Sequence, residues 1–189
     1  MNTNQPSNQL EPVTLSPLER ELEVINRVSS SQLVTFDLEE LYTPGDRVEF
    51  DLKDLLFQEL VLKEKDFRDF VKNHDWSQYQ NKFVAIICSA DAIVPTWAFM
   101  LLSSSLQPFA KQVIFGSLRD LEITLFNQAL VKVDWKKYDN AKVVIKGCSK
   151  VEVPVSAYVE VTNKLRPIAA SIMFGEPCST VPIFKRKSS

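Results

Sequence analysis

The residues of this chain best suited to chemistry are its three cysteines, Cys88, Cys148 and Cys178, each followed directly by a serine. Cys88 and Cys148 stand where a short apolar run ends and a polar loop begins. At such element ends, free backbone N–H groups and hydroxyls stabilise a thiolate, the form of cysteine that binds metals and attacks electrophiles. The pattern predicts a functional site at the ends of structural elements, without naming a reaction.

A shared metal site is the first hypothesis for these thiols. Soft thiolates select zinc, iron–sulfur clusters or copper over magnesium and calcium. Zinc would take a fourth ligand, and a cluster held by three cysteines with an open corner could be handed on to another protein. No Cys-x-x-Cys pair pre-forms half a site, so the fold must assemble it. The predicted metal ligands are Cys88, Cys148, Cys178, Asp91 and His74, the last being the single histidine.

The fourth ligand is not settled by the sequence. A helix ending near His74 leads into an apolar strand over 83–87, and at about 3.3 Å per residue this strand puts His74 roughly 15–20 Å from Cys88. Asp91 follows Cys88 by three positions and reaches it more easily. Aspartate is also favoured in turns and as a helix cap, which gives Asp91 a structural alternative.

Two other hypotheses compete with the metal site. Free cysteines are among the most buried residue types, so the thiols would pack as inert hydrophobes in a structural or interaction protein. In a cysteine-dependent enzyme, the helix that begins near Pro95 would activate Cys88. His74 is poorly placed as its base, however, and the four glycines form no phosphate-binding cluster. The sequence leaves enzymatic activity open and favours a non-enzymatic role.

Composition excludes several partner classes. The chain has 189 residues, of which 45% are hydrophobic, and this is enough for a full core that needs no disulfide or metal for stability. Its net charge of -2 comes from interspersed charges, so neither nucleic acid nor an anionic membrane surface is an expected partner. The apolar stretch from Ala92 to Leu102 is too short to cross a membrane and is typical of a buried helix. An odd cysteine count without an apolar signal segment favours the cytoplasm.

The second half of the chain determines the predicted fold class. Apolar runs at 83–87, 113–115 and 143–145 alternate with helical patterns at 95–108, 118–130 and 154–174. Strands buried on both faces and alternating with helices indicate an α/β fold, with a mainly parallel sheet and helices on its faces. Ligands in such folds usually lie beyond the carboxyl ends of the strands, where Cys88 and Cys148 are placed.

The remaining segments complete the predicted organisation. A helix is expected from Pro17 to Val28, and the turn at Pro44-Gly45 predicts that Val48–Leu52 pairs back on the strand at 33–36. Pro167 is expected to break the last helical stretch, with Gly175 as a helix C-cap. No internal repeat is evident. We predict a flexible arm (1–17), a single α/β domain (18–185) and a basic tail (186–189).

Several segments of the chain resemble one family of bacterial proteins, the domain of unknown function 2480. The resemblance covers roughly residues 21–185 and leaves out the N-terminal arm and the tip of the tail. The segments that carry it include the three cysteine motifs and a His-Asp-Trp step. They are 33–39, 57–68, 74–76, 88–98, 146–149 and 175–182.

The resemblance implies a bacterial, cytosolic protein in which the cysteine motifs and His74-Asp75-Trp76 belong to the family pattern. It also implies a link to iron–sulfur assembly proteins as partners, because members are encoded close to their genes. The family brings no assigned activity with it. The expectation is therefore an accessory factor carrying zinc or an iron–sulfur cluster, and the oligomeric state is left open.

Overall fold

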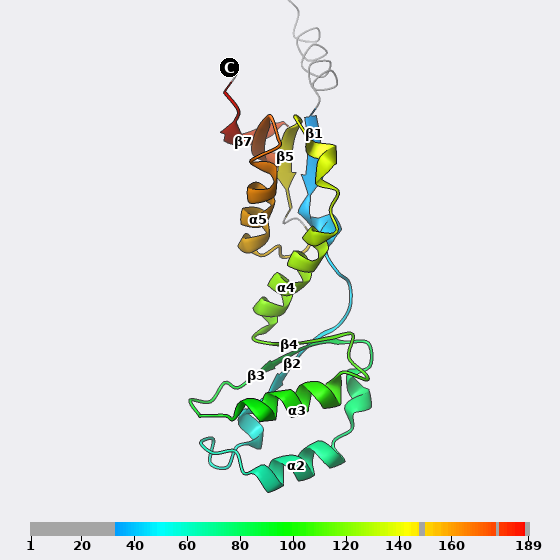
Figure 1. Ribbon diagram of the computed structural model, residues 1–189, viewed down its shortest axis with the longest axis vertical. Helices are drawn as coiled ribbons and strands as arrows, with labels where there is room; N and C mark the ends of the chain where they lie inside the picture. Colours follow the sequence, from blue (N-terminus) through cyan, green and yellow to red (C-terminus); the bar gives the residue numbers. More distant parts are fainter. Residues whose placement is uncertain (1–32, 148–149, 177, 188–189) are drawn as a thin grey trace, which may run out of the picture.

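The computed structural model describes residues 33–147, 150–176 and 178–187, and it has two lobes with separate sheets (Figure 1). Within these residues one sheet has the strand order β1-β5-β6-β7 and the other has β2-β3-β4. Parallel pairing dominates both sheets, and helices cover them, which confirms the predicted α/β class. The predicted helix at 17–28 lies outside the described residues. The division into arm, domain and tail stays a prediction.

Lobe A contains the β1-β5-β6-β7 sheet. Its first three strands are parallel, and β7 runs antiparallel to β6 at the edge. Its core includes Phe36, Val143, Ile145 and Ile172, all buried. The elements are β1 (Leu33–Asp37), β5 (Lys142–Lys146), β6 (Ser171–Glu176), β7 (Ser179–Lys185), α4 (Leu118–Val131) and α5 (Val155–Leu165).

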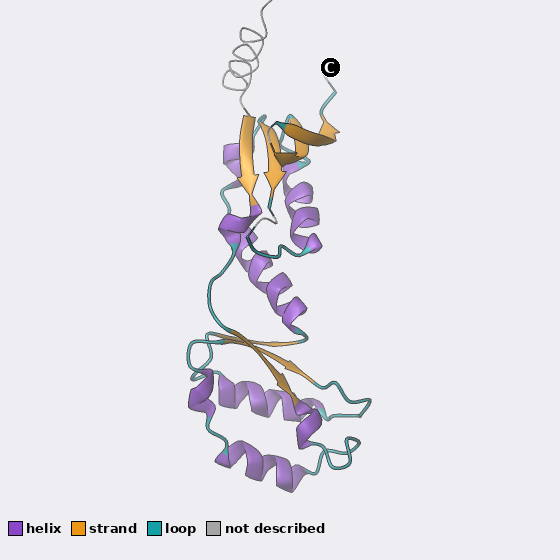
Figure 2. Ribbon diagram, turned by 180° about the vertical axis from the view of Figure 1, so that it is seen from behind, coloured by secondary structure: helices purple, strands orange, loops and turns teal. Residues whose placement is uncertain are grey.

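Lobe B contains the β2-β3-β4 sheet, which is parallel throughout. Helices α2 and α3 lie on one side of this sheet, with α3 next to the strands (Figure 2). The core between them includes Phe50, Phe67, Ile86 and Leu102. The elements are β2 (Arg47–Asp51), α2 (Glu64–Asn73), β3 (Phe83–Ile87), α3 (Thr96–Leu106) and β4 (Gln112–Phe115).

Helix α4 joins the two lobes. Leu121 and Leu125 of α4 pack with Phe83 and Ala85 on the face of the lobe B sheet opposite α3. Phe126 and Leu130 of the same helix belong to the core of lobe A. Because one helix supplies both contacts, the lobes cannot separate without exposing apolar side chains.

The lobes are an internal repeat that the sequence analysis missed. A shift of 59 positions superposes Phe67 on Phe126, both buried, and Asp75 on Asp134, each of which caps a 3-10 helix. The same shift relates Pro95 to Pro154 at the starts of α3 and α5, two helices of equal length. These 3-10 helices are η3 (Trp76–Tyr79) and η4 (Trp135–Tyr138).

A second, shorter repeat gives each lobe its first strand. Asp37 and Asp51, 14 positions apart, each end a strand and cap a 3-10 helix, η1 (Leu38–Leu41) and η2 (Leu52–Leu55). Each lobe is thus strand, helix, strand, helix, strand. The chain completes lobe B before it returns to lobe A, so β1 pairs with β5, which is far along the sequence.

Two other sequence-based expectations were wrong. The strand after Pro44-Gly45 does not pair with β1, because β1 and β2 bury Phe36 and Phe50 in different cores. The last segment is not a second helix. As expected, α5 ends before Pro167, but β6 and β7 follow it, and Gly175 lies within β6 instead of capping a helix.

Gly175 provides a test of the β6–β7 hairpin. Its φ is +118°, and an added Cβ would lie 2.7 Å from the carbonyl oxygen of Ser179. Gly175→Ala is therefore expected to lower the free energy of unfolding by about 1–3 kcal/mol, measured by urea denaturation. Ser104→Ala, an exposed position on α3, serves as the control and should leave stability nearly unchanged. Equal stabilities of the two variants would contradict this backbone assignment.

Candidate functional site

Cys88 follows β3 at the carboxyl edge of the lobe B sheet, as predicted. It is half-buried, and its thiol donates a long hydrogen bond to the carbonyl oxygen of Ala90, 3.7 Å away. The next residue, Ser89, donates from both its backbone N–H and its hydroxyl to the carboxylate of Asp51. The serine of this Cys-Ser step therefore ties the loop after β3 to the end of β2, which is a structural role.

This contact makes stability depend on pH. Burial raises the pKa of Asp51, but the hydrogen bonds from Ser89 and from the backbone of Lys53 outweigh it, so the pKa lies below its ordinary value of 3.8. Because the folded pKa is depressed, the stabilisation is present above the unfolded pKa and is lost as pH falls through the folded one. Ser89→Ala should therefore be less stable than the parent at neutral pH, with a difference that shrinks below about pH 4. Urea unfolding across this range measures it, and a difference that stays constant down to the lowest pH would contradict it.

The carboxyl edge of lobe A holds charged side chains. Lys146 Nζ lies 3.1 Å from Asp37 Oδ2, and this hydrogen bond, together with the charges of Asp37 and Glu176, raises the pKa of Lys146. Cys178 is exposed in the turn between β6 and β7. Cys148 lies outside the described residues. A pocket of about 290 Å³ at this edge is lined by Asp37, Glu39, Lys146, Gly147, Phe174, Gly175 and Glu176.

His74 belongs to an aromatic cluster in lobe B. Its ring lies 4.6 Å from that of Trp76, and its Nε2 is 3.0 Å from the side-chain amide nitrogen of Gln78 and 3.4 Å from the Tyr79 hydroxyl. Asp91 is exposed in the loop that follows β3. His74 is thus placed to pack and to hydrogen-bond within this cluster.

The structure divides the predicted ligands between the lobes. Cys88, Asp91 and His74 belong to lobe B, and Cys178 belongs to lobe A. Among residues 33–147, 150–176 and 178–187, no group of three or more His, Cys, Asp and Glu side chains could hold a metal ion. Because Cys148 falls outside this set, the three-cysteine site stays a prediction.

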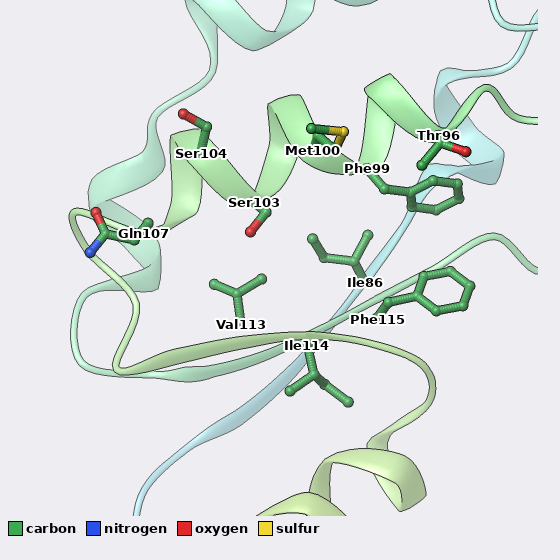
Figure 3. Close-up of a pocket in the computed structure, with 10 residues that line it drawn as sticks. All are labelled: Ile86, Thr96, Phe99, Met100, Ser103, Ser104, Gln107, Val113, Ile114 and Phe115. Carbon is green, nitrogen blue, oxygen red and sulfur yellow. The ribbon is translucent and has the colours of Figure 1, made fainter.

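A large apolar groove lies between α3 and β4 in lobe B, with a volume of about 730 Å³ (Figure 3). Ile86 and Val113 point from the sheet toward α3, whereas Ile114 points to the opposite face. Phe99 and Phe115 meet edge-on at one end of the groove, with ring centroids 5.1 Å apart. The groove is lined by Ile86, Thr96, Phe99, Met100, Ser103, Ser104, Gln107, Val113, Ile114 and Phe115.

The rim of this groove is apolar and exposed to solvent. Phe115 is 72% exposed, and Met100 is 68% exposed. From Ala92 to Ala110 the chain contains no charged residue, although 24% of its residues are charged. Contiguous exposed apolar surface of this kind marks sites where proteins bind other molecules.

The groove borders a strand edge that is unpaired among the described residues. Within them, β4 is the last strand in its sheet and pairs only with β3. The N–H of Gly116 donates to the carbonyl oxygen of Ile86, so alternation along the strand directs the polar backbone groups of Ile114 inward and those of Val113 and Phe115 outward. Two residues therefore offer donors and acceptors beside the apolar groove.

Sequence reasoning missed this site, although a signal for it was present. The uncharged stretch from Ala92 to Leu102 was interpreted as a buried helix. Ala98 and Leu102 are indeed buried, but Met100 lies on the outer side of α3. A helix without charges on its outer face is typical of a surface that is covered by something else.

The fold and the groove define a two-lobed α/β protein with an exposed apolar groove on one lobe. The chain belongs to the family described as protein of unknown function (DUF2480), whose model matches residues 22–186, as the sequence motifs predicted. No curated protein and no solved structure matches the chain. Among the described residues, no helix has both the length and the apolar character needed to span a membrane.

Proposed function

We propose that the protein is a non-enzymatic accessory protein that binds a polypeptide in the α3–β4 groove. The observation that carries this proposal is the combination of an uncharged apolar groove with an unpaired strand edge along the same side. An extended polypeptide added to β4 would receive main-chain hydrogen bonds from Val113 and Phe115. Its alternate side chains would enter the groove between Phe99 and Ser103.

The Cys88 thiol and the histidine support this choice over catalysis. The Cys88 thiol bonds the Ala90 carbonyl, and His74 Nε2 lies near Tyr79 and Gln78. A cysteine nucleophile needs a base within hydrogen-bond reach, and none of these contacts brings a base to the Cys88 thiol. The odd number of cysteines supports a reducing, cytosolic location.

The proposal is tested by placing the photo-reactive amino acid p-benzoylphenylalanine at position 115 in the full chain within cells. A covalent adduct with a polypeptide, mapped by mass spectrometry to one defined segment, is the expected result. Met100→Lys should abolish this adduct, because it puts a charge in the groove. The matched control carries the same amino acid at Val131, which is 83% exposed on α4. Absence of adducts at 115, or equal adducts at 131, would overturn the proposal.

A second candidate keeps the thiols in a functional role. β5 and β6 are parallel neighbours, so their carboxyl ends lie at one edge, where Gly147 and Glu176 line the same pocket. Cys148 and Cys178 follow these residues in the sequence by one and two positions. This order favours a site in lobe A for zinc or an iron–sulfur cluster, in an accessory factor for iron–sulfur assembly proteins.

Metal and acid-labile sulfide content of protein purified without oxygen tests this second candidate. Iron with sulfide, or zinc, at about one site per chain and lost in Cys178→Ser would support it. Metal-free protein, or metal retained in Cys178→Ser, would contradict the proposed lobe A site. Cys88→Ser is the matched control, because Cys88 lies in the other lobe, and it should retain the metal.

A further inference from the structure

We propose that the polypeptide bound in the groove is a second copy of this chain, whose β4 pairs antiparallel with the first β4 about a twofold axis. This inference rests on the proposed binding function and names its partner. It would join the two lobe B sheets into one continuous sheet with the order β2-β3-β4-β4-β3-β2. Three observations point to this partner.

The internal repeat indicates what kind of element covers this edge. The 59-position shift relates β4 to β6, and Val113 and Phe115 to Ile172 and Phe174. In lobe A this edge is covered by β7, an antiparallel strand in which Phe184 pairs with Ile172 and Val181 pairs with Phe174. The aromatic contact is repeated too, since Tyr158 meets Phe174 as Phe99 meets Phe115. Lobe B has the same edge without such a strand among the described residues.

Two of the other three sheet edges, β7 and β2, carry features that block pairing with another chain, and β4 does not. β7, at one edge of the lobe A sheet, contains Pro182 and Lys185, and β2, at the other edge of the lobe B sheet, contains Arg47, Glu49 and Asp51. Charged residues and proline on edge strands prevent association with another sheet. The sequence of β4, Gln-Val-Ile-Phe, contains neither. An unprotected apolar edge is a ready template for pairing with another chain.

Helix α3, beside β4, also differs from its repeat counterpart α5. Arg166, just after α5, holds its guanidinium over the ring of Phe184 on β7. At the equivalent position lobe B has Gln107, which is uncharged and lines the groove. A twofold axis places identical surfaces opposite each other, so any charge near it would face its own copy. The uncharged helix face that lines the groove is therefore compatible with self-association.

The register follows from which backbone groups point outward. Val113 and Phe115 carry the outward groups, so pairing Val113 with Phe115 of the partner subunit and the reverse gives hydrogen-bonded pairs. Ile114 then lies on the twofold axis, opposite its own copy in a non-hydrogen-bonded pair. Phe115 of the partner subunit stands beside Val113 on the α3 side of the sheet and fills the groove near Met100. The exposed Phe115 ring of each chain thus occupies the groove of the other chain.

Sedimentation equilibrium of the full chain over a range of concentrations tests the proposal. The expected result is a monomer–dimer equilibrium with an upper mass of twice 21.6 kDa. Phe115→Asp should raise the dissociation constant at least about 100-fold, because the twofold symmetry places the substituted residue in the interface twice. Val131→Asp replaces another exposed apolar residue, away from β4, and should leave the dissociation constant unchanged. Circular dichroism confirms that both variants are folded.

The register has its own test in Ile114→Cys. Cα atoms in a non-hydrogen-bonded antiparallel pair lie about 4.5 Å apart, within the range a disulfide spans. Mild oxidation should give a dimer linked through position 114 on both chains, identified by mass spectrometry. A dimer that forms no such link would overturn the proposed pairing.

Failure of this inference is distinguishable from failure of the binding function. A parent chain that is monomeric at every concentration, or a dimer that survives Phe115→Asp, overturns self-association through β4. If the photo-reactive group at 115 then links to a different protein, or to residues 1–32 of its own chain, the groove still binds a polypeptide but not a second copy. If it links to nothing, both proposals fall.

Discussion

Phe67→Ala and Phe126→Ala are each expected to lower the free energy of unfolding by about 3–5 kcal/mol, measured by urea denaturation. Each ring is 1% exposed, and each lies at the same place in its lobe, 59 positions apart. Removing either ring loses its transfer free energy and leaves a cavity that the surrounding side chains fill only in part. Because domains are stable by about 5–15 kcal/mol, either change removes a large share of the total.

The two substitutions also test the repeat. Similar losses at Phe67 and Phe126 are expected if the two lobes are equivalent units. Val131→Ala, at an exposed apolar position of α4, is the control and should change stability by less than about 0.5 kcal/mol. A large loss at one phenylalanine and none at the other would contradict the equivalence of the two cores.

The second large effect is expected from proline substitutions in β4. Ile114→Pro is expected to destabilise the protein by about 3 kcal/mol or more, because its N–H points toward β3 and a ladder hydrogen bond is lost. Phe115→Pro should cost much less in the isolated chain, because its N–H points to the open edge, where proline is tolerated. Phe115→Pro should nevertheless abolish binding at β4, since it removes an outward donor and the exposed ring.

Thermal unfolding and sedimentation together measure this contrast. Phe115→Ala, which removes the ring and keeps the donor, is the matched control and should retain part of the binding. If Phe115→Pro destabilised the chain as much as Ile114→Pro, the edge of β4 would not be open as described. If Phe115→Pro bound as tightly as the parent, main-chain pairing at β4 would be excluded.

Much of the fold could be predicted because its signals are local. The apolar runs at Phe83–Ile87 and 143–145 are strands, and the helical patterns at 95–108 and 118–130 are α3 and α4. Pro167 ends α5 for the reason expected, the lost hydrogen bond of an interior proline.

The arrangement of the strands could not be predicted, because it depends on contacts distant in sequence. Pro44-Gly45 is as compatible with a link between two sheets as with a hairpin. The strands belong to two sheets because Phe36 and Phe50 are buried in different cores. The strand β6 was taken for helix because its short apolar run carries no local strand signal, although its repeat partner β4 was identified as a strand. Applying the 59-position shift to β4 would have predicted a strand at β6.

The site was predicted in part. Cys88 lies at the end of β3 as expected, but Ser89 serves to bind Asp51, and His74 packs among aromatic rings. Residue types alone could not indicate which side of α3 faces solvent, since Met100 and Leu102 are equally apolar and only packing separates them. The groove is therefore a property of the folded chain.

Amide hydrogen exchange at single-residue resolution measures directly whether the open edge of β4 is covered in solution. The N–H groups of Val113 and Phe115 are expected to be protected in the concentrated parent chain, as are those of Ile172 and Phe174 beside β7. Phe115→Asp should expose the Val113 amide and leave Ile172 protected. Rapid exchange of Val113 and Phe115 in the parent at every concentration, and with cell extract added, would show that no partner covers this edge.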